Sequence, residues 1–211
     1  MNPVSAHSDP IQHYLQGCAQ IAQKVDRAAL ERMVDILAEV RERGGRLFIL
    51  GVGGGAGHAG HAVCDFRKIA GIQAYSPSDN VSELTARTND EGWETTYSEW
   101  LKGCRIGSDD AVLVFSVGGG DLARNISPNL VRALQTAQKA RAKILGIVGR
   151  DGGFTAEAAD ACVIIPTVDP ALITALTESF QAVLWHLLVS HPKLQAAAMK
   201  WESQQPLAAS V

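Results

Sequence analysis

A glycine-packed turn between an apolar strand and a helix constrains this chain more than any other feature. The turn lies in the segment 47–66, which reads LFILGVGGGAGHAGHAVCDF. Gly51 and the run Gly53 to Gly55 permit positive φ angles and a close approach of the backbone. The first free N–H groups of the following helix then point into the turn, where they can bind an anion such as phosphate. The segment therefore predicts a strand, an anion-binding turn and a helix, in that order.

The helix after this turn carries two chemically active side chains. His61 and Asp65 are four residues apart, so they lie on one helix face beside the predicted phosphate site. An imidazole and a carboxylate in this place suggest chemistry on a sugar phosphate. Alone, the turn is a weak signal, because it matches neither the dinucleotide-binding G-x-G-x-x-G fingerprint nor a P-loop. A histidine four residues before an aspartate also arises often by chance.

Composition narrows the class of protein. The 211 residues, 46% hydrophobic and 19% charged, fit one α/β domain with a substantial core. A formal net charge of −3 offers no general basic surface, so we expect no nucleic-acid partner. We find no signal-peptide pattern and no apolar run of about 18 residues, and expect neither secretion nor membrane association.

The cysteines favour a cytoplasmic protein. They are scattered, lack CxxC spacing and stand mostly in apolar runs, as reduced and buried thiols do. The four are Cys18, Cys64, Cys104 and Cys162.

Apolar periodicity predicts the order of helices and strands. Helical spacing runs from about Pro10 to Arg43, and we predict two helices with a break near Asp26. Four strand-like runs follow, each apolar enough to be buried on both faces. They are 46–50, 111–117, 143–149 and 161–166. Helical patterns between them favour an α/β fold, a three-layer αβα sandwich with a central parallel sheet. Ligands of such sheets bind beyond the carboxyl ends of the strands, where both glycine-rich turns fall.

The second glycine-rich turn follows the predicted strand 111–117 and reads GGGDLARNISPN. Hydroxyls and open backbone amides make it a second candidate for holding phosphate. Its candidate ligands are Ser116, Gly118, Gly119, Gly120 and Ser127. Arg124 adds a guanidinium that can bind phosphate through two hydrogen bonds. Ser127 before Pro128 also fits an ordinary helix N-cap with proline at the first helical position, which needs no ligand.

Four motifs occur in a characteristic order along nearly the whole chain. They are the G-x-G-G turn at 51–54 that enters the helix with His61, the segment SELTARTNDEGWE at 82–94, the turn 116–129 that ends in SPN, and GRDGG at 149–153. In this order they resemble the SIS (sugar isomerase) domain family, and within it the phosphoheptose isomerases. The resemblance implies a single SIS domain over 1–211, with the SIS fold and a helical N-terminus.

The resemblance also implies a reaction. Phosphoheptose isomerases convert sedoheptulose 7-phosphate to D-glycero-D-manno-heptose 7-phosphate, a precursor of bacterial surface polysaccharides. Such an aldose–ketose isomerisation passes through an enediol, so it needs a base and a group that stabilises an oxyanion. Several members of the family bind zinc. The resemblance also implies a homotetramer with sites at subunit junctions. We therefore expect the helices at about 10–43 to lie between copies.

Site residues of the family transfer to this chain only in part. His61 matches the family's helical histidine, whereas Asp65 stands where the family usually has glutamate. The family's second pair, a Gln and a His eight residues apart, admits two alignments. An ungapped alignment places Thr174 and Ala182 there, and the site would be lost. An insertion of one helical turn places Glu178 and His186 there, on one helix face, and we favour it.

With the inserted turn, two histidines and two carboxylates form the predicted catalytic and metal-binding set, with one zinc or similar ion per subunit. The set is His61, Asp65, Glu178 and His186. Glu178 is either a second anionic ligand or a free general base. His186 follows Trp185 on an amphipathic helix, so it also fits a core or interface histidine. His58, near the first turn, need not face the site.

The predicted substrate-binding residues come from both turns and from the middle motif. They are Gly53, Gly54, Gly55, Asn80, Ser82, Ser116, Gly118, Gly119, Arg124 and Ser127. The loops depart from the family, because Val52 replaces an asparagine and 116–120 lacks most of the family's hydroxyls, with 121–126 inserted. We therefore expect phosphate to bind through backbone N–H groups. Ser78 to Asn80 fits an ordinary turn equally well.

Three classes of function remain open from the sequence. The first is a sugar-phosphate isomerase. The second is a non-catalytic SIS module that binds a sugar phosphate as a sensor or regulator, like the replication-initiator-associating members of the family. The third is a structural paralogue that pairs with an active subunit. The acid, the histidine and the pair of residues eight positions apart favour the isomerase. The residues that differ from the family's pattern favour the other two classes.

Overall fold

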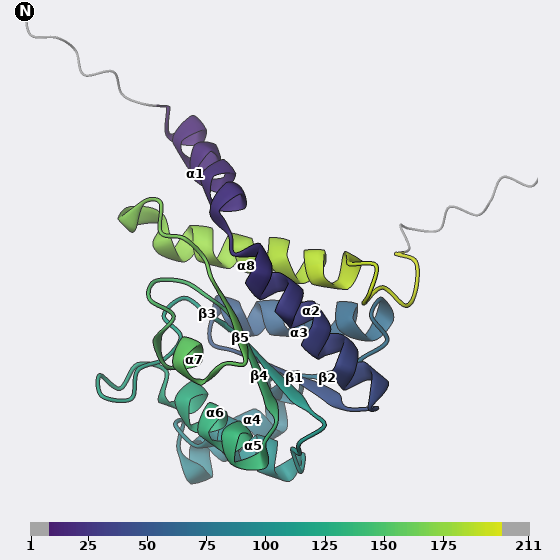
Figure 1. The fold of residues 1–211 in the computed structure, drawn as a ribbon. Helices are drawn as coiled ribbons and strands as arrows, with labels where there is room; N and C mark the ends of the chain where they lie inside the picture. Colours follow the sequence, from purple (N-terminus) through teal and green to yellow (C-terminus); the bar gives the residue numbers. More distant parts are fainter. Residues whose placement is uncertain (1–8, 200–211) are drawn as a thin grey trace, which may run out of the picture.

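A five-stranded parallel sheet forms the centre of the structure, a computed structural model that describes residues 9–199. The strand order is β2-β1-β3-β4-β5. The strands are β1 (Arg46–Gly51), β2 (Gln73–Tyr75), β3 (Ala111–Ser116), β4 (Lys143–Val148) and β5 (Ala161–Ile164). Helices cover both faces of the sheet (Figure 1), which confirms the three-layer αβα fold. The ends of the predicted domain, 1–8 and 200–211, lie outside the described residues.

The helices divide between the two faces of the sheet. The helices are α1 (Pro10–Lys24), α2 (Arg27–Glu42), α3 (Gly54–Lys68), α4 (Val81–Glu91), α5 (Thr96–Gly103), α6 (Pro128–Ala140), α7 (Gly153–Ala158) and α8 (Ile173–Ser190), with 3-10 turns at Pro77–Asp79 and Pro170–Leu172. Leu47 and Ile49 of β1 pack into the core under α2, α3 and α8. Phe48 and Leu50 point to the other face, under α5 and α6. This alternation is what a parallel sheet buried on both faces requires.

The predicted break between the first two helices is confirmed. Asp26 caps α2, because its carboxylate accepts a hydrogen bond from the N–H of Ala29 at 3.0 Å. All four predicted strands are present. The short strand β2 was not predicted, since three residues give too little pattern.

Two predictions about burial are wrong. β5 lies at the edge of the sheet, so Ile164 is 38% exposed and the strand is not buried on both faces. All four cysteines are free, as expected, but none is fully buried, and Cys64 is exposed on α3. Apolar neighbours in sequence do not decide which face of a helix a thiol takes.

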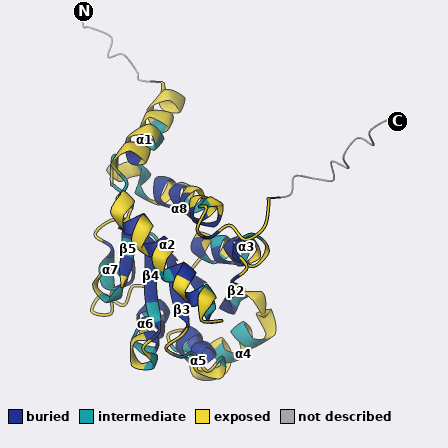
Figure 2. Cartoon of the chain, turned by 45° about the vertical axis from the view of Figure 1, so that its right-hand side comes forward, coloured by how far each residue is buried: buried dark blue, intermediate teal, exposed yellow. Residues whose placement is uncertain are grey.

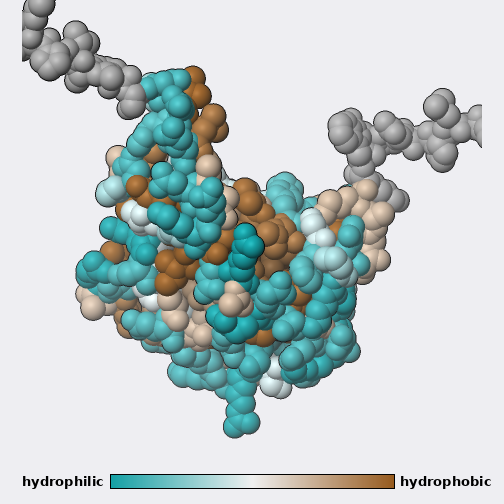
Figure 3. All heavy atoms as spheres, turned by 45° about the horizontal axis from the view of Figure 1, so that its top comes forward, coloured by the Kyte–Doolittle hydropathy of each residue, from teal (hydrophilic) through white to brown (hydrophobic). Residues whose placement is uncertain are grey.

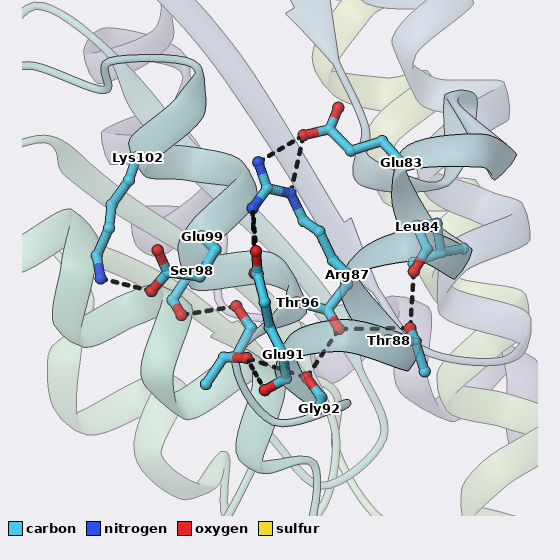
Figure 4. Close-up of polar contacts among 11 residues, drawn as sticks. Glu83, Leu84, Arg87, Thr88, Glu91, Gly92, Thr96, Ser98, Glu99 and Lys102 are labelled. Carbon is cyan, nitrogen blue, oxygen red and sulfur yellow. Dashed lines mark hydrogen bonds and ion pairs between the residues drawn. The ribbon is translucent and has the colours of Figure 1, made fainter.

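The helix α4 lies at the margin of the second core. It has no buried residue, and Leu84 is its half-buried contact with that core. Ion pairs within the helix add to its stability. Arg87 bridges Glu83 at 2.9 Å and Glu91 at 3.2 Å, one helical turn to either side (Figure 4). Thr88 of α4 lies 3.5 Å from Thr96 of α5, so the two helices meet through hydroxyls.

The helix α8 is the most apolar of the chain. By length and composition alone, the stretch Pro170–Ser190 is long and apolar enough to cross a membrane. In the structure one face packs against the sheet and α3 through Phe180, Leu184 and Trp185, as Figure 2 shows by the alternation of buried and exposed residues. The helix is therefore accounted for as a core helix, and its other face exposes Val183 and Leu187.

A buried ion pair joins the starts of β1 and β3. Asp110 is 4% exposed and accepts hydrogen bonds from Arg46 Nη2 at 2.8 Å, from the N–H of Arg46 at 2.9 Å and from the N–H of Gly107 at 2.9 Å. Burial raises the pKa of the Asp110 carboxyl, but these hydrogen bonds outweigh burial and hold the pKa below its usual 3.8. The unfolded chain thus binds this proton more tightly than the folded protein does.

We expect the variant Asp110→Asn to lower the free energy of unfolding at pH 7 by about 3 kcal/mol, because it breaks a buried pair. Above pH 3.8 the contribution of the carboxylate is fully present, and it is lost as the pH falls through the lower folded-state pKa. The difference between the two proteins should therefore shrink below pH 3.8. Urea denaturation at pH 7 and below pH 3.8 measures this difference in the free energy of unfolding, with the exposed Asp109→Asn as control. An equal difference at both pH values would contradict this account.

Candidate active site

The first glycine turn brings the start of α3 directly onto the ends of β1 and β3. A Cβ at Gly51 would collide with the backbone of Gly55, and a Cβ at Gly55 would lie 2.6 Å from the carbonyl oxygen of Phe115. Gly53, with φ of +59°, begins the helix without a side-chain cap. The N–H of Gly55 donates to the carbonyl of Val52 at 3.1 Å. Contrary to the prediction, this N–H is therefore not free to bind an anion.

The two glycine-rich turns meet at one pocket of about 330 Å³. Its walls come from both turns, from the loop after β4 and from α8. They are Val52, Gly55, Ser116, Val117, Gly118, Ile126, Ser127, Arg150, Thr174, Glu178 and Gln181. The pocket lies at the carboxyl ends of the strands, as predicted for this class of sheet.

In the second turn, the hydroxyl of Ser127 does not make the hydrogen bond that the N-cap interpretation predicts. Ser127 has φ of +47° and its side chain makes no capping hydrogen bond, so that interpretation is wrong for its hydroxyl. Pro128 does stand at the first helical position. Ser116 Oγ accepts a hydrogen bond from the N–H of Gly119 at 3.0 Å and thereby shapes the turn.

Arg124 does not line the pocket. Its guanidinium is paired with Asp121 at 2.6 Å, within a small hairpin closed by a bridge between Asp121 and Ile126, and its side chain is 69% exposed. The pocket's arginine is Arg150. The sequence held a signal for it, because GRDGG follows the strand next to the second turn.

Asn80 and Ser82 also lie away from the pocket. Asn80 caps α4, since its side-chain oxygen accepts a hydrogen bond from the N–H of Glu83 at 3.3 Å. Both residues are exposed at the start of α4. The 3-10 turn at Pro77–Asp79 matches the alternative interpretation of this segment as an ordinary turn.

Three of the four predicted metal ligands meet between α3 and α8. Potential ligand atoms of His61, Asp65 and His186 all lie within 4.8 Å of one another. Asp65 Oδ2 is 3.4 Å from His61 Nε2 and 3.3 Å from His186 Nε2. Trp185 Nε1 donates to the same oxygen at 3.1 Å, which orients the carboxylate. Two imidazoles and one carboxylate form a donor set that suits zinc and similar divalent ions.

Glu178 lies apart from this cluster, at the first glycine turn. Both of its carboxylate oxygens would be 2.7 Å from a Cβ at Gly54, so the carboxylate rests directly on the start of α3. The residue is half-buried and lines the pocket, two helical turns before His186 on α8. Thr174, the residue of the ungapped alignment, lines the same pocket one turn earlier.

A buried amide, which was not predicted, links the pocket to the cluster. Gln181 is fully buried, and its Nε2 donates to the carbonyl of Ile147 in β4 at 3.3 Å. Its Oε1 therefore faces His58 Nδ1 at 3.0 Å, which carries the proton of that bond. His58 packs against Trp185, with ring centroids 5.1 Å apart. The signal for this contact in the sequence was the helical spacing of these residues on α3 and α8.

The chain is similar to known proteins in sequence and in fold. No protein-family model matches the chain. It is 32% identical over 163 residues to the phosphoheptose isomerase of Trichlorobacter lovleyi, covering 74% of this chain and 80% of the relative. It is 27% identical over 191 residues to a phosphoheptose isomerase of Helicobacter pylori, covering 88% and 87%. The structure of phosphoheptose isomerase GmhA from Neisseria gonorrhoeae shares the fold, with a TM-score of 0.73, 21% identity, and 85% and 94% of the two chains covered.

We expect His61→Asn or His186→Asn to weaken binding of a divalent ion by at least about tenfold, because each removes one of three clustered ligands. Titration of the metal-free protein with zinc measures this without any substrate. Cys64→Ser, an exposed position on the same helix, is the control. Unchanged zinc affinity in both histidine variants would show that the cluster is not a metal site.

A matched pair of glycine variants tests the close approach at α3. Gly55→Ala should lower the free energy of unfolding by about 1 to 3 kcal/mol, because its Cβ meets a backbone carbonyl. Gly57→Ala, in the same helix with nothing within 4 Å, should instead raise stability by about 0.5 to 1 kcal/mol. Thermal and urea denaturation of both variants decide it. Equal effects would contradict the geometry described for the turn.

Proposed function

The chain belongs to the phosphoheptose isomerase family, and we propose that it converts sedoheptulose 7-phosphate to D-glycero-D-manno-heptose 7-phosphate. One observation carries the proposal beyond family membership. A pocket at two glycine-rich turns and a cluster of metal-ligating side chains lie on the same pair of helices, α3 and α8. A substrate with a phosphate at one end and a carbonyl at the other needs two such centres.

The spacing of the two centres suits this substrate. Gly54 and His61 are seven residues apart on α3, which corresponds to about 10 Å along the helix axis. We place the phosphate at the second-turn side of the pocket, beside Ser116, Gly118 and Ser127, and the C1–C2 end of the sugar between Glu178 and the cluster of His61 and His186. Hydroxyls and backbone N–H groups of the turn donate hydrogen bonds to phosphate oxygens.

Glu178 is the residue that we assign as general base. Its carboxylate has no hydrogen-bond partner among residues 9–199, whereas Asp65 accepts from Trp185 and lies against two imidazoles. In the direction from ketose to aldose, Glu178 takes a proton from C1 and returns it to C2 through an enediol, while the proton of the C1 hydroxyl passes from O1 to O2. Asp65 remains fixed in the cluster.

We propose zinc as the cofactor, one ion per subunit, held by His61, Asp65 and His186. When bound, zinc polarises the carbonyl and stabilises the negative charge of the enediolate. In this assignment Glu178 would not be a metal ligand, and the three residues that would hold the ion match the number of protein ligands in catalytic zinc sites.

The test is conversion of sedoheptulose 7-phosphate by the purified protein, before and after chelation. Glu178→Gln and His61→Ala should each lower kcat by at least about a hundredfold, because base catalysis contributes that much or more. Chelation should lower it as well, and added zinc should restore it. Glu157→Gln, an exposed glutamate on α7, is the matched control. Full activity of Glu178→Gln would contradict its role as base.

If the protein binds sugar phosphate but shows no turnover, the result would contradict the proposed isomerase activity and favour a sugar-phosphate sensor. The changes from the family's Glu to Asp65 and from its Gln to Glu178 are the observations that keep this second function in view.

We also propose a cytoplasmic homotetramer. Apolar side chains are exposed on α1 and α8, on a side of the molecule where Figure 3 shows apolar surface. They include Ile11, Leu15, Val183 and Leu187, which are 72%, 61%, 52% and 42% exposed. Side chains of this kind are typical of an interface between subunits.

Light scattering should give a mass about four times that of one chain. Leu15→Glu should shift the protein towards smaller species, because it places a charge in the proposed interface. Gln20→Glu, on the same helix but away from the surface hollow that Ile11 and Leu15 line, is the control for added charge. A monomeric wild-type protein would overturn the tetramer.

A further inference from the structure

We infer that Arg150 supplies the positive charge that binds the substrate's phosphate in this chain. The inference rests on the proposed function for the identity of the substrate. Arg150 and Glu178 are the two charged side chains among the residues that line the pocket. A carboxylate repels a phosphate dianion, so the anion must lie at the end of the pocket that Arg150 provides.

The turn itself offers few alternatives to a cation. Residues 117–120 read VGGG, so hydroxyls are confined to Ser116 and Ser127. Ser116 Oγ is already bonded to the N–H of Gly119. The neighbouring Arg124 is neutralised by Asp121 at 2.6 Å, whereas Arg150 forms no ion pair within the part of the chain that the structure describes. The free guanidinium at the pocket is that of Arg150.

The backbone holds Arg150 in place on both sides. The N–H of Gly149 donates to the carbonyl of Val117 at 3.1 Å. After the loop, Phe154 N–H donates to Gly120 O at 2.9 Å, and the Thr155 hydroxyl donates to Gly119 O at 2.7 Å. The loop 149–155 and the second glycine turn therefore form one rigid unit. A side chain mounted on it binds without the entropy cost of ordering a loop.

The position of the Arg150 side chain points the same way. Its backbone has a φ of +54°, in the left-handed region, which costs a side-chain-bearing residue about 1 kcal/mol relative to glycine. The Cδ of Arg150 would lie 3.8 Å from a Cβ at Gly118, so the arginine stem passes over the turn.

The experiment is calorimetric titration of the protein with inorganic phosphate and with sedoheptulose 7-phosphate. Arg150→Gln should weaken both by about tenfold to a hundredfold, as expected for loss of a charged hydrogen-bond donor. Arg150→Lys should recover part of the loss, because it keeps the charge without the planar fork. Arg124→Gln, the matched control, should change either affinity less than about twofold.

Arg150→Gly separates binding from folding. Glycine accepts the left-handed conformation, so this variant should be at least as stable as the wild type and still lose phosphate affinity. Phosphate binding unchanged in Arg150→Gln and Arg150→Gly would overturn the inference. Because binding is measured directly, Arg150-dependent phosphate binding by a protein without isomerase activity would support this inference and refute the proposed function.

Discussion

The site depends on how closely α3 approaches the strand ends beneath it. Gly51 and Gly55 leave no room for a side chain, so the first turn of α3 rests on the backbone of β1 and β3. A bulkier residue would lift the helix, and with it His61 and Asp65 would move away from α8. The glycines therefore set the position of α3 and of the side chains that it carries towards α8.

The helices α3 and α8 then form a continuous polar seam over an apolar sheet. Glu178 lies over Gly54, Gln181 bonds to His58, and Trp185 bonds to Asp65. Gln181 also bonds to β4, which ties the seam to the sheet. Buried polar groups are costly unless they are paired, so these hydrogen bonds hold the two helices in one register. The cluster of His61, Asp65 and His186 is thereby held at a fixed distance from the pocket.

Most of the fold could be predicted from the sequence, because long apolar runs and capping residues such as Asp26 act locally. The three-residue strand β2 and the exposed face of β5 could not, since both depend on which strand lies at the edge. The site was harder. His61, Asp65 and His186 meet, whereas Glu178, the fourth member of the predicted set, lies apart at the pocket that both glycine turns reach. The pairing of Arg124 with Asp121 depends on a hairpin that no local pattern reveals, and so Arg150 was overlooked.

The most direct test of the account is a crystal structure of the zinc-loaded Glu178→Gln variant with sedoheptulose 7-phosphate. The phosphate should lie in the pocket at Ser116, Gly118 and Arg150, and zinc should lie on His61, Asp65 and His186. The C1–C2 end of the sugar should lie between the pocket and the zinc ligands. Phosphate bound elsewhere, or the sugar's carbonyl end away from the α3–α8 seam, would contradict it.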